Sequence, residues 1–154
     1  MKLALIGLGS VGRGVAHVVK NDPRFKIVAA ADSKSGAVNP DGLDIDRLLQ
    51  GKKETGRIGT PDWTAFRIAA EVDYDVLVEV TPTNAETGEP ALSTIKIALS
   101  RGKHVVTSNK GPISLYYREL ESLAEENGVS LRFEGTVAGA VPIINGIRNG
   151  LAGN

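Results

Sequence analysis

Short apolar runs alternate with longer amphipathic stretches along most of this chain. The apolar runs have the length and the Val, Ile, Leu and Ala content of buried strands, and they cover residues 2–6, 27–31, 75–81, 104–107 and 130–133. Between them, apolar positions recur at helical spacing over 11–19, 90–101 and 113–127. Because strands alternate with helices, the pattern predicts an α/β fold, with a doubly wound, mainly parallel sheet covered by helices on both faces.

Residues 33–61 depart from this alternation. The segment is rich in glycine and proline, including Gly36, Pro40, Gly51 and Gly56, and it offers one short helical pattern around 43–49. Such residues interrupt regular elements. We therefore predict a loop-rich surface region between the second and third strands.

Length and charge narrow the class of protein. The 154 residues fit one ordinary domain, and 42% hydrophobic with 23% charged residues is typical of a folded chain. Eighteen Lys and Arg offset eighteen Asp and Glu, so the basic excess that binding to a phosphate backbone usually requires is missing. Neither nucleic acid nor an anionic membrane is an expected partner.

The scarce residue types exclude several chemistries. The chain has no cysteine and only two histidines, so disulfides, a thiol nucleophile and a three-histidine zinc site are excluded for it. No apolar run reaches the ~20 residues of a membrane span. Together with the missing cysteines, this leads us to expect a cytoplasmic protein.

A glycine-rich turn follows the first predicted strand and opens the first predicted helix. Its residues are Gly7, Leu8, Gly9, Ser10, Val11 and Gly12. In a dinucleotide fingerprint the first glycine permits the tight turn, the second lets backbone approach the pyrophosphate, and the third allows close packing of helix on strand. We assign these six residues to cofactor binding.

Asp32 strengthens this assignment. It stands 20 residues beyond Gly12 at the end of the second strand, from which a carboxylate reaches the adenosine ribose hydroxyls. Asp32 favours NAD, whereas Lys34 is placed to attract the 2′-phosphate of NADP, so the choice between NAD and NADP stays open. An S-adenosylmethionine site is the alternative interpretation of the same turn and acid.

Polar residues follow the next two strands. Thr81 ends one of them, and Ser108 and Lys110 come directly after the other. Open parallel sheets bind ligands beyond the carboxyl ends of their strands, so all three residues are candidate cofactor contacts. Lys110 is also the candidate catalytic cation, although a solvated loop lysine is the common alternative.

A loop of small residues with one carboxylate follows the last strand. Glu134 and main-chain carbonyls of this loop are oxygen ligands of the kind that hard cations prefer. The alternative is a close-packed turn in which Glu134 caps or pairs with a neighbour. The residues alone leave both open.

These motifs together resemble the N-terminal NAD(P)-binding domain of the homoserine dehydrogenases. The resemblance covers nearly the whole chain and is carried by the glycine turn, the strand end at 78–81, the Thr-Ser-Asn-Lys-Gly-Pro stretch at 107–112 and the Glu-Gly-Thr-Val loop at 134–144. It implies a Rossmann-like fold, with residues 1–134 as the NAD(P)-binding domain and 135–154 as the start of a substrate and dimerisation domain. The expected cofactor is NAD or NADP.

The resemblance also implies an activity and its residues. Members of the family interconvert L-homoserine and L-aspartate 4-semialdehyde by hydride transfer, in the biosynthesis of threonine, methionine and isoleucine. Lys110 matches a lysine that contacts cofactor and substrate. A sodium ion would be held by residues that match Glu134, Val137, Gly139 and Val141. A homodimer of the complete protein is expected.

Two other functions remain as alternatives. One is a non-catalytic NAD(P)-binding or sensing module, and the other is an amino-acid dehydrogenase of another specificity. Family members continue beyond the Gly-Asn end of this chain into the homoserine pocket and a second catalytic lysine. We therefore expect the isolated chain to be incomplete and poorly active.

Overall fold

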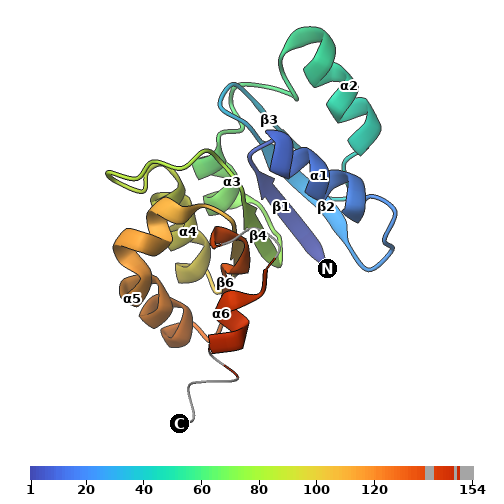
Figure 1. Cartoon of the computed structure of the whole chain (residues 1–154). Helices are drawn as coiled ribbons and strands as arrows, with labels where there is room; N and C mark the ends of the chain where they lie inside the picture. The colour runs from blue at the N-terminus through green and yellow to red at the C-terminus, as the bar shows by residue number, and fades with distance from the viewer. Residues whose placement is uncertain (138–140, 148, 150–154) are drawn as a thin grey trace.

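The computed structural model describes residues 1–137, 141–147 and 149. A six-stranded sheet forms its centre, and helices pack against it (Figure 1). The elements in chain order are β1 (Lys2–Ile6), α1 (Ser10–Val19), β2 (Lys26–Ala31), β3 (Gly36–Val38), α2 (Ile45–Thr55), α3 (Ala65–Glu71), β4 (Val76–Glu79), α4 (Ala91–Ser100), β5 (His104–Thr107), α5 (Lys110–Glu126), β6 (Leu131–Arg132), the 3-10 turn η1 (Glu134–Thr136) and α6 (Ile143–Gly146).

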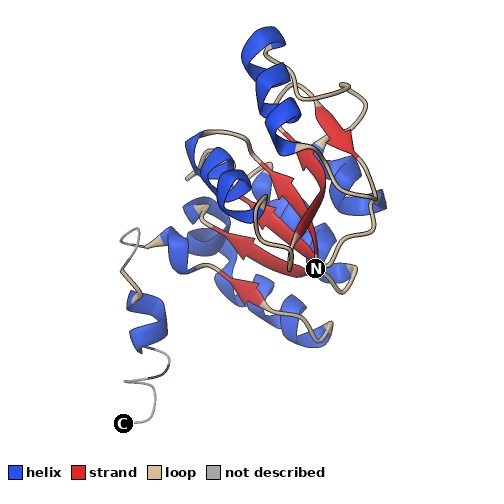
Figure 2. Cartoon of the chain, turned by 90° about the vertical axis from the view of Figure 1, so that its right-hand side faces the viewer, coloured by secondary structure: helices blue, strands red, loops and turns tan. Residues whose placement is uncertain are grey.

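The strand order in the sheet is β3-β2-β1-β4-β5-β6. Every neighbouring pair is parallel except β2 and β3, which are antiparallel. The strands form one twisted sheet with helices on both sides (Figure 2). The doubly wound, mainly parallel fold predicted from the sequence is therefore confirmed.

Side chains alternate along the strands between two apolar layers. On β1, Leu3 and Leu5 face the layer under α1 and α2, whereas Ala4 and Ile6 face the layer under α3, α4 and α5. Successive residues of a strand point to opposite faces, so a strand buried on both sides is apolar throughout. This explains why the central strands appear in the sequence as continuous apolar runs.

The two faces of the sheet are not equally covered. Val105 of β5 is fully buried under α4 and α5, but Val106 on the other face is 43% exposed. Helices α1 and α2 pack near β1 and β2, and among the described residues the apolar cluster beneath them includes no residue of β5. Helices lie on both faces, as predicted, but they cover the second face only in part.

The region predicted to be loop-rich contains more structure than expected. The helix predicted at 43–49 is α2, which begins later and continues through Gly51 to Thr55. The Asp44 side chain accepts a hydrogen bond from the Arg47 N–H at its start, and Gly56 ends it with a φ of 72°. The short edge strand β3 was not predicted, because an antiparallel addition of three residues leaves no periodic pattern.

One further helix was not predicted, and another begins earlier than predicted. Helix α3, which packs on β1 and β2, was not predicted, since seven residues with a Thr64 cap are too few for a clear period. Helix α5 begins at Lys110, ahead of the predicted residue 113, because the Asn109 side chain caps it. Within the described part of the chain, no helix is long and apolar enough to cross a membrane.

Candidate functional site

The glycine turn and the end of β4 are in direct contact. Gly7 adopts a φ of 101°, and a Cβ atom placed on it would lie 2.8 Å from the carbonyl carbon and oxygen of Val80. Only glycine accepts both this conformation and this approach without strain. The first glycine of the motif therefore does what the sequence predicted, and it brings the turn beside Thr81.

Gly12 and Gly9 also occupy the environments expected of them. A Cβ atom on Gly12 would lie 1.9 Å from the Gly7 carbonyl oxygen, so α1 packs on the turn at a distance that excludes any side chain. Nothing lies within 4 Å of the corresponding position on Gly9, whose exposed backbone is open to a ligand. The turn is tight on its inner side and accessible on its outer side.

The start of α1 carries no side-chain cap. Gly9 is its N-cap, and no acidic residue occupies the first turn. Ser10 and Val11 are exposed there, whereas the Leu8 side chain is buried in the core and leaves only its backbone for a ligand. A helix start whose N–H groups lack a side-chain partner attracts anions, and a pyrophosphate is one.

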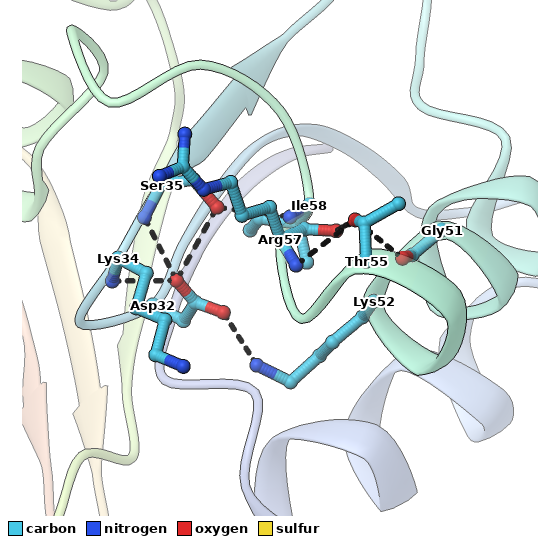
Figure 3. Close-up of polar contacts among 8 residues, drawn as sticks. All are labelled: Asp32, Lys34, Ser35, Gly51, Lys52, Thr55, Arg57 and Ile58. Atoms are coloured by element: carbon cyan, nitrogen blue, oxygen red, sulfur yellow. Dashed lines mark hydrogen bonds and ion pairs between the residues drawn. The ribbon is translucent and has the colours of Figure 1, made fainter.

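Asp32 lies at the end of β2, beside the turn, and is held by four donors. Its carboxylate accepts hydrogen bonds from the Lys34 N–H at 2.8 Å and the Ser35 N–H at 2.9 Å, from the Ser35 hydroxyl at 3.5 Å, and from the Lys52 ammonium group (Figure 3). Only 7% of the Asp32 side chain is exposed. Burial alone would raise the pKa of Asp32, but the hydrogen bonds from Lys52, Lys34 and Ser35 outweigh it and hold the pKa below its ordinary value.

Lys52 was missed by the sequence analysis. The predicted helix ended at residue 49, whereas α2 continues to Thr55 and carries Lys52 to Asp32. The Lys34 side chain does not pair with Asp32, and its ammonium group lies near Gly56 at the end of α2. The Ser35 hydroxyl accepts a hydrogen bond from the Ile58 N–H, so Arg57 also lies close to this loop (Figure 3). One cationic side chain thus pairs with Asp32, and two more cationic residues, Lys34 and Arg57, stand in the neighbouring loops.

Thr81 is turned toward a buried carboxylate. Its N–H donates to Glu79 Oε1 at 2.9 Å, and its hydroxyl donates to the same oxygen. Glu79 is fully buried at the end of β4. Burial raises the pKa of Glu79, while hydrogen bonds from Thr81 and Thr107 oppose the rise. The sequence analysis included Glu79 in the strand end at 78–81 but assigned it no role, because it stands within an apolar run.

Lys110 is the first residue of α5 and is exposed. Its ammonium group makes no ion pair with any residue that the structure describes. Ser108 lies beside the loop of the last strand, since a Cβ atom on Gly135 would lie 3.2 Å from Ser108 Cβ. The ends of β4, β5 and β6 therefore meet at one edge of the sheet, as the sequence predicted.

The Glu134 carboxylate contacts backbone N–H groups. It accepts hydrogen bonds from Ile144 at 3.1 Å and from Asn145 at 3.1 Å, both near the start of α6. This is the capping role that the sequence left as the alternative to a cation site. Val137 and Val141 are exposed, and Gly139 lies outside the described residues. Among the residues placed in the structure, no three acidic or histidine side chains gather as metal ligands.

Residues 7–134 match the family model described as homoserine dehydrogenase, NAD binding domain. A homoserine dehydrogenase from Methanocaldococcus jannaschii is 42% identical over 100% of this chain and 50% of its own length. An NAD(+)-dependent homoserine dehydrogenase from Pseudomonas canavaninivorans is 39% identical over 99% of this chain and 48% of its own length.

Solved structures give the same result. A putative homoserine dehydrogenase from Archaeoglobus fulgidus superposes with a TM-score of 0.87 at 39% identity, over 99% of this chain and 48% of that one. A hyperthermophilic archaeal homoserine dehydrogenase in complex with NADPH superposes with a TM-score of 0.84 at 29% identity, over 99% of this chain and 49% of that one. The chain thus spans about half the length of the relatives that it matches.

Proposed function

The chain belongs to the family of homoserine dehydrogenase NAD-binding domains, and from this premise we propose that it forms the nucleotide-binding half of a homoserine dehydrogenase. In that role it holds NAD or NADP and supplies one side of the catalytic crevice. The substrate pair is L-homoserine and L-aspartate 4-semialdehyde.

One observation carries the proposal: the Gly7–Gly12 turn and Asp32 stand at the ends of the adjacent parallel strands β1 and β2. Their spacing fits a dinucleotide whose pyrophosphate lies on the start of α1 and whose adenosine ribose reaches Asp32. The open space at Gly9 and the uncapped start of α1 support the same placement.

Lys110 is proposed as the catalytic cation. A bound nicotinamide ring gives or takes the hydride at the carbon that carries the homoserine hydroxyl. During reduction, the aldehyde oxygen develops negative charge and takes up a proton. An ammonium group at this oxygen stabilises the charge and is able to donate the proton. Lys110 follows the carboxyl end of β5 and forms no ion pair with the described residues, so it is suited to this role.

The choice between NAD and NADP follows from the charges near Asp32. We propose that Asp32 holds the ribose hydroxyls of NAD, and that Lys52, Lys34 and Arg57 offer positive charge to the 2′-phosphate of NADP. The ion pair with Lys52 offsets the negative charge with which Asp32 would otherwise repel that phosphate. We therefore expect the chain to bind both cofactors.

The sodium site at Glu134, Val137, Gly139 and Val141 stays a prediction. A cation there would share the Glu134 carboxylate with two N–H donors, so the described residues do not form a ready site. A calorimetric titration of the chain with sodium chloride, against choline chloride at equal ionic strength, tests it. Heat of binding that is specific to sodium supports the site, and identical traces reject it.

The complete protein is proposed to be a homodimer that takes homoserine in the half beyond this chain. Light scattering on the complete protein tests the assembly. The activity is tested by following reduced nicotinamide absorbance with L-homoserine and either oxidised cofactor. Turnover with homoserine but not with other hydroxy amino acids supports the proposal. A complete protein that binds the cofactor and turns over none of them contradicts it.

A further inference from the structure

A buried carboxylate joins the loop that carries Thr81 to the end of β5, which lies just before Lys110 and α5. Glu79 ends β4, and no part of it is exposed. Its Oε1 accepts from the Thr81 N–H and hydroxyl, and its Oε2 accepts from the Thr107 hydroxyl at 3.1 Å. One carboxylate thus connects the loop after β4 to the end of β5.

Asn109 closes this network from the other side. Its N–H donates to the Thr107 hydroxyl oxygen at 3.0 Å, and its Nδ2 donates to the Thr81 hydroxyl and carbonyl oxygens at 3.2 Å each. Its Oδ1 accepts from the Gly111 N–H at 3.2 Å and so caps α5. The amide orientation is fixed, because the Gly111 N–H only donates.

The directions of these hydrogen bonds require an acceptor at position 79. Each threonine hydroxyl accepts a hydrogen bond from Asn109, so its own proton must be donated elsewhere. In the described part of the chain, both protons are received by oxygens of Glu79. A glutamine at this position would turn an NH₂ group toward one hydroxyl and leave a buried proton without an acceptor.

The loops that this network joins are packed together without spare room. A Cβ atom on Gly111 would lie 2.3 Å from the Asn84 carbonyl oxygen, so the loop after β4 rests directly on the start of α5. A displacement of either loop therefore moves the other. Lys110 precedes this contact and follows the Asn109 cap.

We propose that Glu79 is a positioning residue, whose carboxylate sets where Thr81 and Lys110 stand relative to the nicotinamide half of the dinucleotide. This inference rests on the proposed function. Glu79 itself touches no reacting atom, because it is buried behind Thr81 and Thr107. Asp32 and the glycine turn, which serve the adenosine half, make no hydrogen bond to the network within the described residues.

The test separates the two halves of the cofactor. ADP-ribose carries the adenosine and pyrophosphate groups alone, whereas NADH adds the nicotinamide, whose fluorescence reports its environment. In the whole chain, Glu79→Gln is expected to leave the Kd for ADP-ribose within about twofold of the unsubstituted value. The same substitution should raise the Kd for NADH about tenfold and abolish the fluorescence change of the bound nicotinamide.

Two further variants keep the test decisive. Thr107→Val removes one hydrogen bond to Glu79 at nearly constant volume. It should also raise the Kd for NADH while leaving the Kd for ADP-ribose nearly unchanged, and it replaces Glu79→Gln if that variant does not fold. Tyr74→Phe is the matched control, because it deletes a buried hydrogen bond, from the Tyr74 hydroxyl to the Ala69 carbonyl, before the start of β4. It should leave both ligands bound as in the unsubstituted chain.

Wild-type binding of NADH and ADP-ribose by both network variants would overturn the inference. So would an equal loss of both ligands together with a lowered Tm, since that is the result of a purely structural role. If the unsubstituted chain bound neither ligand, the proposed function itself would fail, and this outcome is distinguished before any variant is measured.

Discussion

The Lys52 ammonium group of α2 donates a hydrogen bond to the Asp32 carboxylate at the end of β2. The two residues come from elements that are separated along the chain by the strand β3, and the Asp32 side chain is almost completely shielded from water. This ion pair places a cation where the fold is expected to receive the adenosine ribose. We therefore expect cofactor choice to depend on this pair of residues and not on Asp32 alone.

Replacement of Asp32 by alanine should weaken the binding of NADH more than the binding of NADPH. The carboxylate is expected to accept hydrogen bonds from the ribose hydroxyls of NADH, and their loss should raise its Kd about tenfold. The affinity for NADPH should change little, because the Lys52 ammonium group is then free to contact the 2′-phosphate. Parallel calorimetric titrations measure both constants. Equal losses for the two cofactors would count against ribose recognition by Asp32.

The same carboxylate should make the stability of the chain depend on pH. The pKa of Asp32 is lowered in the fold from its ordinary 3.8, so the ionised form stabilises the fold above pH 3.8. This contribution is lost as the pH falls through the lowered pKa. The difference in the free energy of unfolding between the unsubstituted chain and Asp32→Asn should therefore be largest near neutral pH and should decrease in acid. Urea unfolding over a pH series measures it, and a constant difference would refute the assignment.

Two glycines of α1 should respond to alanine in opposite ways. Gly12→Ala places a methyl group against the Gly7 carbonyl and should destabilise the fold by at least about 1–3 kcal/mol. The same substitution should remove cofactor binding. Gly14→Ala is the matched control, since nothing lies within 4 Å of its Cβ position. It should stabilise the helix by up to about 1 kcal/mol. Thermal unfolding of both variants checks this, and similar effects would contradict the close packing.

Lys110→Ala should separate binding from catalysis. In the complete protein the cofactor Kd should change by less than about tenfold, whereas kcat should fall by about 10²–10⁴, the usual loss on removing a proton-transfer group. Lys96→Ala is the control, because Lys96 lies on α4 and pairs with Glu119, which is more than two helical turns along α5 from Lys110, so its loss should leave kcat unchanged. Unchanged turnover of the Lys110 variant would remove it from the mechanism.

The sequence predicted the central strands and the glycine turn because both depend on local patterns. Apolar runs mark strands that are buried on both faces, and each glycine of the turn meets a local steric demand, as Gly7 and Gly12 show. The mainly parallel direction of the strands followed from their alternation with helices. These features needed no knowledge of distant contacts.

Residues that act through distant contacts were not predictable in this way. Lys52 reaches Asp32 only because α2 extends through Gly51, a residue that lowers helix propensity. Glu79 stands within an apolar run, and Thr107, which donates a hydrogen bond to its carboxylate, comes from another strand end. In both cases the tertiary structure, and not the local pattern, decides what the side chain does.

We propose above all that this chain binds a nicotinamide dinucleotide on the Gly7–Gly12 turn. The first experiment is therefore a calorimetric titration of the chain with NADH and NADPH, repeated with Gly12→Ala and Gly14→Ala. We expect micromolar binding of both cofactors by the unsubstituted chain and by Gly14→Ala, and none by Gly12→Ala. Absence of binding to either cofactor by the folded, unsubstituted chain would contradict it.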